Sequence, residues 1–313
     1  MQLRFKLFVS HSTLALVPLV LFGLLAYWNT AASFLRIADD QVRTILDKSI
    51  EQMEGLIRVG ADNTEALAKM ESARTAFRLA EFDSDMSQMR NYYQDYLKTH
   101  AYLRNIRLVT VDGKEVISAA DLPPGKKINY TALAWFARAL NSEGIYFVDL
   151  HVSPEFVAPV LLISYPVFDG KNTIGLLVAD IDGGQVTDFI NGLRLGQTGY
   201  GYIINNAGTL IAHPKREKIF VENLSNSPSE TLRAAVAQMR SLETGKSRYT
   251  YEGVDKYVFY RPYRNLGWSV GLTIPVSELL SGARTLIRFD RDSRRGDYDR
   301  DGFCGADNRR RHH

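Results

Sequence analysis

Two short patterns of acidic residues could support chemistry in this sequence. Asp149 and His151 are two positions apart, so on a strand a carboxylate and an imidazole would share one face and could bind a metal ion together. No third ligand is visible for that site, and a metal-dependent enzyme would rest on this pair alone. Asp180 and Asp182 also share a strand face, where one carboxylate could bind a ligand and the other cap the helix expected after Gly183.

The remaining residue types exclude several kinds of site. Cys304 is the single cysteine, which excludes an intrachain disulfide and a cysteine-based zinc site. The formal net charge is +3, and most of it lies after residue 285, so the body is too nearly neutral for a nucleic acid partner. No nucleophile elbow, phosphate-binding loop or zinc-binding helix motif occurs. We therefore expect no catalytic residue, no metal and no cofactor.

The elements that must position these residues occur twice in the sequence, about 95 residues apart. Residues 107–113 and 202–208 each join a β-branched run to a turn that ends in glycine, and an apolar run follows, which is the pattern of a β-hairpin. Residues 163–168 and 258–263 form a second pair with the same offset, and each leads through a turn to a final strand. We therefore expect two similar small sheet modules in tandem.

Helices and strands are segregated rather than alternating, which favours an α+β fold with antiparallel sheets. The first module is expected over residues 101–194 and the second over 195–285. Their predicted strands are residues 103–111, 114–119, 144–149, 159–168 and 173–181, and then 200–205, 208–213, 247–252, 255–263 and 266–274. Shorter helices are expected at 130–141, 183–194 and 228–242, with a terminal helix that begins at Pro275.

A helical stalk is expected to lead into the modules, over residues 29–100. Apolar residues recur at spacings of three and four along a helix that runs to about residue 59, at Leu35, Ala38, Val42, Leu46, Ile50, Met53 and Ile57. A second, more charged helix is expected at about residues 64–99. The apolar stripe could pack on its own modules or form the seam of a homodimer.

The amino terminus predicts a membrane anchor. Leu7 to Trp28 is almost entirely apolar, and as a helix it would span ~33 Å, enough for a bilayer core. Arg4 and Lys6 precede it, so residues 1–28 are interpreted as a cytoplasmic stub and a transmembrane helix. The alternative is a secretory signal peptide cleaved near residues 30–32. Either interpretation places the modules outside the cytoplasm.

The tail, residues 286–313, differs in composition from the rest. Half of its residues are arginine or aspartate, and it has no lysine or glutamate. The simpler interpretation is a disordered tail. The alternative is that the natural reading frame is lost near Arg288, which sequencing of the coding DNA would test.

Several strings in the modules resemble a known sensor family. They are residues 135–140, 146–149, 163–170 and 174–181 in the first module and 199–214 in the second. Together, over about residues 29–285, they are similar to double-Cache (dCache) domains, the extracytoplasmic sensors of bacterial chemoreceptors, sensor histidine kinases and diguanylate cyclases. The resemblance implies a stalk helix that carries a membrane-distal and a membrane-proximal PAS-like module. Family members normally continue into a second membrane helix and an effector, and the tail here is not apolar enough to supply that helix.

The resemblance also implies a ligand site in the first, membrane-distal module. In amino-acid-binding members an aromatic pair on a short helix and acids on later strands contact the ligand, and the matching residues here are Trp135, Phe136, Asp149 and Asp180. Beside them, Tyr130 and Tyr146 could add hydroxyl contacts or form a wall of the pocket. An indole face attracts an ammonium group by ~0.5–2 kcal/mol. As alternatives, the aromatic pair could fill the core, and Asp149 could cap a turn.

One position departs from the family pattern. The family places an arginine two positions before the tryptophan to bind a ligand carboxylate, and here that position is Leu133. A planar guanidinium has no apolar substitute in this role. Recognition of an α-carboxylate would therefore need Arg138, Arg104 or Arg107 to reach the site from elsewhere.

The sequence thus predicts a sensor anchored in the cell inner membrane, with its body in the periplasm or outside the cell. It is expected to bind a small, amine-bearing or amino-acid-like solute in the first module for transmembrane signalling. Its second membrane helix and effector are not visible, and a homodimer through the stalk is possible. The alternative is a structural or protein-interaction ectodomain without a small-molecule ligand.

Overall fold

The computed structural model describes residues 2–80, 82, 85–121 and 128–279, with the side chains of residues 16–18, 20–23 and 39 onward. Residues Asp39–Pro275 form one compact unit. It contains two antiparallel sheets and a long helix, so the predicted α+β class is confirmed. The expected tail, residues 286–313, lies outside the described residues.

The long helix α1 (Gln2–Lys69) extends further than the sequence indicates. A break was expected between about residues 59 and 64, but the helix continues. At Gly60 a Cβ would lie 2.7 Å from the side chain of Ile181, so glycine permits the helix to approach the first sheet. Val42, Leu46, Met53 and Ile57 are buried, while Ile50 is half-buried. The stripe therefore packs on its own modules in this chain.

The helix α1 includes the segment 7–28 that the sequence analysis assigns to the membrane. Among the helices of the described residues, none combines the length and the apolar character that crossing a bilayer requires.

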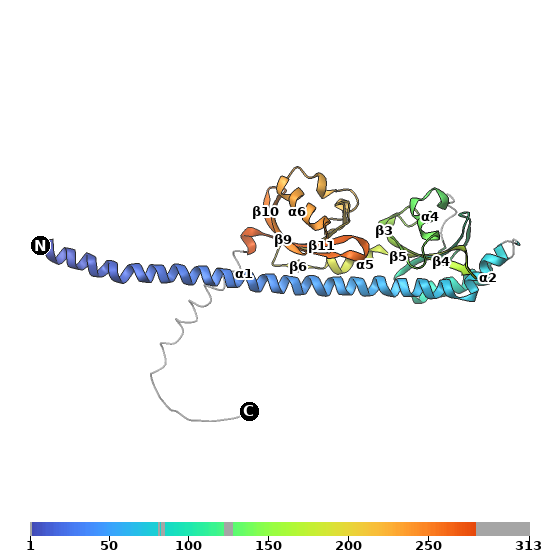
Figure 1. Ribbon diagram of the computed structural model, residues 1–313, viewed down its shortest axis with the longest axis horizontal. Helices are drawn as coiled ribbons and strands as arrows, with labels where there is room; N and C mark the ends of the chain where they lie inside the picture. The colour runs from blue at the N-terminus through green and yellow to red at the C-terminus, as the bar shows by residue number, and fades with distance from the viewer. Residues whose placement is uncertain (1, 81, 83–84, 122–127, 280–313) are drawn as a thin grey trace, which may run out of the picture. The chain divides into compact units, whose positions relative to one another are not determined.

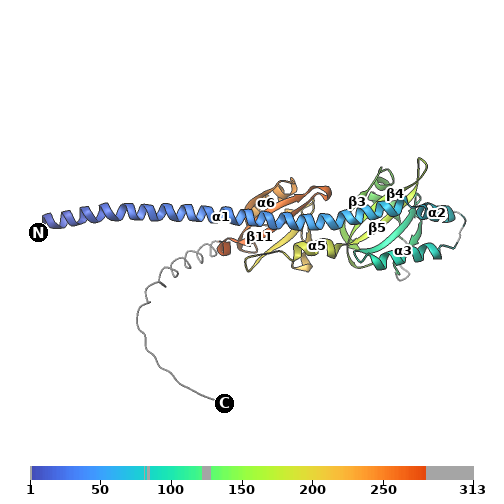
Figure 2. The same ribbon diagram turned by 90° about the horizontal axis from the view of Figure 1, so that it is seen from below.

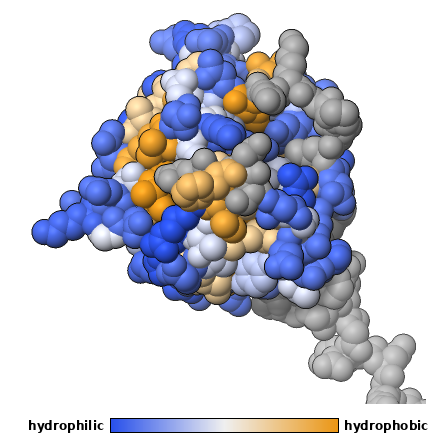
Figure 3. Space-filling model, turned by 90° about the vertical axis from the view of Figure 1, so that its right-hand side faces the viewer, coloured by the Kyte–Doolittle hydropathy of each residue, from blue (hydrophilic) through white to orange (hydrophobic). Residues whose placement is uncertain are grey.

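The second predicted helix is divided in two, α2 (Glu71–Ala80) and α3 (Ser87–Thr99). Both pack against strands of the first module, so they belong to that module as much as to a stalk. Seen from the end where α2 lies, the surface is mainly polar, with apolar side chains between the polar ones (Figure 3). Apolar groups of this kind are normal on a protein surface.

The first module is a five-stranded antiparallel sheet in the order β2-β1-β5-β4-β3. Its strands are β1 (Leu103–Thr110), β2 (Glu115–Ser118), β3 (Tyr146–Ser153), β4 (Ala158–Asp169) and β5 (Asn172–Asp182). In place of one predicted helix over 130–141, a 3₁₀ turn η1 (Tyr130–Ala132) precedes α4 (Ala134–Leu140). Side chains alternate along β4 and β5, so successive residues lie on opposite faces of this sheet. The helix α1 covers one face, and η1 and α4 cover the other (Figures 1 and 2).

The helix α5 (Gly183–Asn191) connects the modules. Its N-cap is Asp182, whose carboxylate accepts a hydrogen bond from the backbone N–H of Gly184 at 2.9 Å. The capping role expected for one of the two acids at this point is therefore confirmed for Asp182.

The second module repeats the architecture of the first. Its strands are β6 (Arg194–Leu195), β7 (Gly199–Ile204), β8 (Leu210–Ala212), β9 (Gly245–Tyr251), β10 (Val254–Tyr263) and β11 (Trp268–Pro275). The helix α6 (Glu230–Arg240) covers one face, and the 3₁₀ turns are η2 (Arg216–Lys218), η3 (Leu224–Asn226) and η4 (Arg264–Leu266).

The predicted duplication is confirmed by the order of the strands. The path β8-β7-β11-β10-β9 in the second sheet corresponds, strand for strand, to β2-β1-β5-β4-β3 in the first. The turns that begin both repeats end in a glycine with positive φ, +81° at Gly113 and +84° at Gly208. This backbone conformation strains other residues, which is why both copies carry glycine at the same place.

Candidate functional site

The candidate site of the first module begins with three aromatic side chains on η1 and α4. Tyr130 and Phe136 are buried in the apolar core on this face of the sheet, and Trp135 is half-buried at its edge. The ring of Trp135 meets those of Tyr130 and Phe136 edge-on, at centroid distances of 6.4 and 5.8 Å. Tyr146 on β3 packs against the same core. The structure therefore brings together four of the residues named from the sequence.

A buried ion pair lies beside these aromatic groups. Arg107 on β1 is 4% exposed and Asp180 on β5 is 1% exposed, and the two form a salt bridge across neighbouring strands. A guanidinium nitrogen of Arg107 also contacts Glu155 at 2.9 Å, and another donates to the Tyr130 hydroxyl at 3.3 Å. Tyr130 in turn donates to Glu115 at 2.8 Å. The ion pair and the aromatic group thus form one cluster joined through Tyr130.

The charges in this cluster are unbalanced, because the guanidinium of Arg107 pairs with the carboxylates of Asp180 and Glu155, and Tyr130 brings in a third carboxylate, Glu115. Burial raises the pKa of Asp180 and of Glu155, and Arg107 opposes both rises. Burial also opposes the charge of Arg107, but Asp180, Tyr130 and Glu155 together raise its pKa above the ordinary arginine value. An excess of carboxylates in a buried place favours the binding of a further cation.

Two buried atoms of the ion pair are left without a hydrogen-bond partner among the described residues. They are Nε of Arg107, a donor, and Oδ1 of Asp180, an acceptor. Buried polar atoms of this kind are rare in folded proteins, because each costs about 1–3 kcal/mol if nothing binds it. A donor and an acceptor on the two members of one ion pair could be matched by the carboxylate and the ammonium group of an amino acid.

Asp149 lies away from this cluster. A β-bulge lies between Val148 and His151 on β3, in the segment that contains Asp149. The Asp149 carboxylate accepts hydrogen bonds from two side chains of the second module. The donors are the indole Nε1 of Trp268 at 2.7 Å and the amide of Asn205 at 3.0 Å. Asp149 therefore links the two modules.

We expect Asp149→Ala to lower the free energy of unfolding by about 1–3 kcal/mol, because it leaves the indole N–H and the amide without their acceptor. Urea unfolding measures the change. Asp149→Asn keeps an acceptor oxygen and should lie closer to the wild type, and Asp188→Ala, at an exposed site, should change the value by less than about 0.5 kcal/mol. An Asp149→Ala variant as stable as the wild type would show that the link contributes nothing to stability.

The metal pair considered from the sequence gains no further ligand here. Nδ1 of His151 lies 2.9 Å from the backbone oxygen of Asp149. Within the described parts of the chain, no group of three histidine, cysteine, aspartate or glutamate side chains could hold a metal ion.

Sequence reasoning missed the central role of Arg107 and did not name Glu155 or Glu115. It considered Arg107 only as one of three substitutes for the arginine absent at Leu133. A usable signal was present, because Arg107 stands between the apolar residues Ile106 and Leu108, both buried. A buried arginine in such a strand needs a carboxylate partner.

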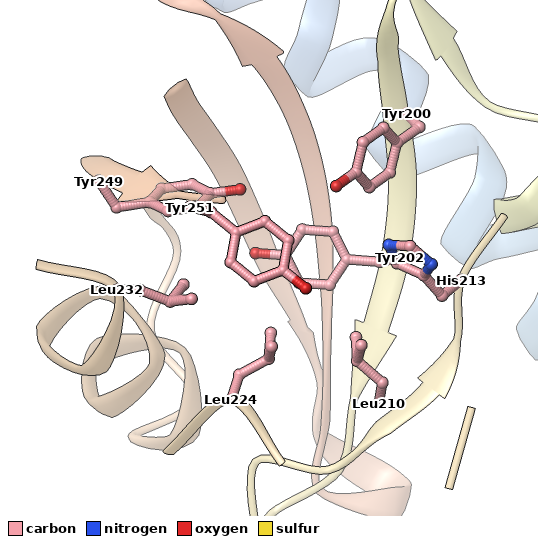
Figure 4. A pocket seen from close by; sticks show the side chains of 8 residues that line it. All are labelled: Tyr200, Tyr202, Leu210, His213, Leu224, Leu232, Tyr249 and Tyr251. Carbon is pink, nitrogen blue, oxygen red and sulfur yellow. The ribbon is translucent and has the colours of Figure 1, made fainter. Parts of the chain in front are cut away.

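A pocket that the sequence did not indicate lies in the second module. Its volume is about 240 Å³, including space open to solvent. It is lined by Tyr200, Tyr202, Leu210, His213, Leu224, Leu232, Tyr249 and Tyr251 (Figure 4).

Comparisons with known proteins agree on the fold. The model of the family described as "Cache domain" (dCache_1) matches residues 38–283. The methyl-accepting chemotaxis protein McpA of Bacillus subtilis (strain 168) is 21% identical over 283 residues, which cover 90% of this chain and 40% of McpA. The chain therefore spans well under half the length of this relative.

Two solved structures illustrate the likeness of the fold. The ligand-binding domain of the Pseudomonas aeruginosa PAO1 amino acid chemoreceptor PctB, in complex with L-Arg, has a TM-score of 0.62 and 16% identity, covering 82% of this chain and 93% of that domain. The ligand-binding domain of the Campylobacter jejuni chemoreceptor Tlp3, in complex with L-valine, has a TM-score of 0.61 and 11% identity, covering 80% and 97%.

Proposed function

The chain belongs to the Cache domain family, and from this membership we propose that it is the extracytoplasmic sensor of a membrane-anchored receptor that binds a small, amine-bearing solute in its first module. The proposed anchor is residues 7–28, which would place the body in the periplasm or outside the cell. The relative McpA is a chemotaxis protein, which supports a role in signalling.

The observation that carries this proposal is the buried cluster around Arg107 and Asp180. It has more carboxylates than cations, and Oδ1 of Asp180 has no partner in the described structure. We propose that the ligand ammonium pairs with this oxygen. A charge-assisted hydrogen bond in a dry site is among the strongest that a protein can offer, since water does not compete with it.

The aromatic side chains would complete the site. Trp135 is half-buried at the edge of the cluster, so its indole can contact a ligand cation, while Tyr130 connects it to Arg107. Phe136 and Tyr146 would form the apolar wall. Asp149 is engaged by Trp268 and Asn205, and we propose that it passes a change in the first module to the second.

Arg107 could replace the arginine that the family has at the position of Leu133. Its Nε is an unused donor beside Asp180. A ligand carboxylate at this nitrogen and an ammonium at Asp180 would make an α-amino acid the first ligand class to test. The domains of PctB and Tlp3, solved with L-Arg and L-valine, support this choice through the fold that they share.

The assembly of the receptor is also part of the proposal. The buried stripe of α1 is covered by the modules of the same chain, so a homodimer through the stalk would use the opposite, polar side of the helix. Cache-type sensing would then shift the helices that flank the modules through a difference in ligand affinity between two states.

A thermal-shift screen of the full chain in detergent with L-amino acids and simple amines tests the proposed function. We expect at least one amino acid or amine to raise the unfolding temperature, and titration calorimetry to give its affinity. Asp180→Asn should lower that affinity at least about tenfold, because the ammonium loses its carboxylate. Trp135→Ala should weaken it as well.

The control is Asp95→Asn, which removes an exposed carboxylate on α3 and should bind like the wild type. Circular dichroism confirms that each variant is folded. If no amine or amino acid stabilises the wild type, the alternative of a structural or protein-interaction ectodomain is preferred. If Asp180→Asn binds as tightly as the wild type, the proposed site is wrong.

A further inference from the structure

The pocket of the second module has a polar side and an apolar side. Tyr200 and Tyr202 come from β7, and Tyr249 and Tyr251 come from β9. Figure 4 shows Tyr200 and His213 on one side and the three leucines on the opposite side of the tyrosine rings. The leucines are Leu210, Leu224 and Leu232. A ligand that fills this space would need one polar end and an apolar body.

Most of the tyrosine hydroxyls are already used within the protein. Tyr251 donates to Glu222 at 2.6 Å, and Tyr249 shares a hydrogen bond of 2.8 Å with Thr273. Burial raises the pKa of both tyrosines to about 12, so they stay neutral. The Tyr200 hydroxyl differs, because it accepts from Nζ of Lys256 at 3.3 Å and its own proton has no acceptor within the described structure.

His213 supplies a second free donor beside Tyr200. Nδ1 of His213 lies 3.0 Å from the backbone nitrogen and 3.3 Å from the backbone oxygen of Lys215. With the shorter contact assigned as a hydrogen bond from the Lys215 N–H, the proton of the neutral ring is on Nε2. Burial lowers the pKa of His213, which keeps the ring neutral. The ring stands edge-on to Tyr200 at a centroid distance of 5.1 Å. No hydrogen bond from Nε2 to another described residue is formed.

Lys256 adds a positive charge without an acidic partner. Its ammonium group lies 4.9 Å from the ring centre of Tyr200 and 5.6 Å from that of Tyr251. No carboxylate of the described residues is within ion-pair distance of it. Lys218 is different, since it pairs with Glu252 at 2.6 Å and Glu222 at 3.2 Å. The nearby glutamates therefore pair with Lys218, and Lys256 is half-buried and forms no ion pair with a described residue.

We propose that this pocket binds a small monocarboxylic acid with an apolar body. The carboxylate is bound by Nζ of Lys256, the hydroxyl of Tyr200 and Nε2–H of His213. Tyr200 and His213 line the pocket, and Lys256 adjoins it through its contact with the Tyr200 hydroxyl. The body lies against Leu210, Leu224 and Leu232. The volume of about 240 Å³ includes space open to solvent, so the acid has few carbon atoms or a single ring.

The same features select against other ligand classes. An amine would place its charge beside Lys256, which is repulsive. A dicarboxylate would bring a second charge to the apolar side, where the leucines offer nothing to pair with it. The two modules would therefore bind opposite charges, since the first module has an excess of carboxylates and the second an unpaired ammonium. This inference concerns the second module only. It does not depend on the amine site proposed for the first module, and either proposal can be wrong without the other.

Calorimetric titration and thermal unfolding of the full chain in detergent test the inference, with butyrate and benzoate as probes and butylamine and benzylamine as amines of similar shape. We expect the carboxylates to bind and to raise the unfolding temperature. Lys256→Met keeps most of the side-chain length, and it should weaken carboxylate binding at least about tenfold. Tyr200→Phe removes only a hydroxyl and should weaken it about three- to tenfold.

Three controls keep the result specific. Lys246→Met removes an exposed ammonium from β9 and should bind carboxylates like the wild type. Asp180→Asn should also keep carboxylate binding, which separates this pocket from the first module. The amines should not bind in competition with butyrate. The inference is overturned if neither carboxylate binds, if Lys256→Met and Tyr200→Phe both bind like the wild type, or if Lys246→Met weakens binding equally.

Discussion

Arg107→Met is expected to lower the free energy of unfolding by about 3–5 kcal/mol, because it leaves the buried Asp180 without its cation. Glu155 loses the same partner. Urea unfolding followed by circular dichroism measures the change. The matched control is Arg104→Met on the same strand, whose salt bridge with Asp182 is partly exposed and should contribute no more than about 1 kcal/mol.

The effect of Arg107→Met should depend on pH. Burial already raises the pKa of Asp180 in the folded protein, and removal of Arg107 raises it further because the opposing cation is gone. A carboxyl group whose folded pKa exceeds its unfolded pKa contributes stability that is complete below the unfolded value and is lost as the pH rises through the folded value. The deficit of the variant should therefore be smaller at about pH 4 than at about pH 8.

The double variant Arg107→Met/Asp180→Asn checks this explanation. It removes both charges, so it should recover much of the lost stability and show a smaller dependence on pH. His151 also lowers the pKa of Asp180, and Glu115 raises it, so both groups are kept unchanged in the comparison. A double variant as unstable as Arg107→Met, at every pH, would mean that the uncompensated charge of Asp180 is not the cause.

The second large effect is expected at the stripe of α1. Ile57 is 1% exposed, and Ile57→Ala should lower the free energy of unfolding by about 2–5 kcal/mol through the cavity that it leaves. Val59, on the same helix, is 48% exposed, and Val59→Ala should change the value by less than about 0.5 kcal/mol. Urea unfolding of both variants gives the comparison.

The same pair of variants separates the two interpretations of the stripe. If the stripe packs on its own modules, the loss in Ile57→Ala is independent of protein concentration. A dimer seam would make the loss change with concentration, because association and folding are then linked. Equal effects of Ile57→Ala and Val59→Ala would contradict the intrachain packing.

The two-module fold could be predicted because it depends on local patterns. Each hairpin is indicated by β-branched runs and a glycine in the turn, and the patterns recur in the same order in both modules. The helix boundaries were harder to predict. Two helices were expected with a break between about residues 59 and 64, but α1 continues through Gly60, where the first sheet packs closely against it. That approach depends on Ile181, far along the chain.

The candidate site could be predicted only in part. Trp135, Phe136 and Tyr130 are close in sequence, so one short segment brings them to the same face of the sheet. Asp180 joins them because β5 pairs with β1, where Arg107 lies. The bulge in β3 engages Asp149 with the second module, and a single irregular residue of this kind leaves no clear pattern in the sequence.

The sequence by itself determined the local elements, their order and the duplication, because these depend on residue types a few positions apart. Only the tertiary structure decided which charges are paired. Arg107 pairs with Asp180, and Lys218 rather than Lys256 pairs with Glu252, through contacts between segments distant in the chain. Alternation along a strand fixes the face on which a side chain lies, but long-range strand pairing determines what stands opposite it.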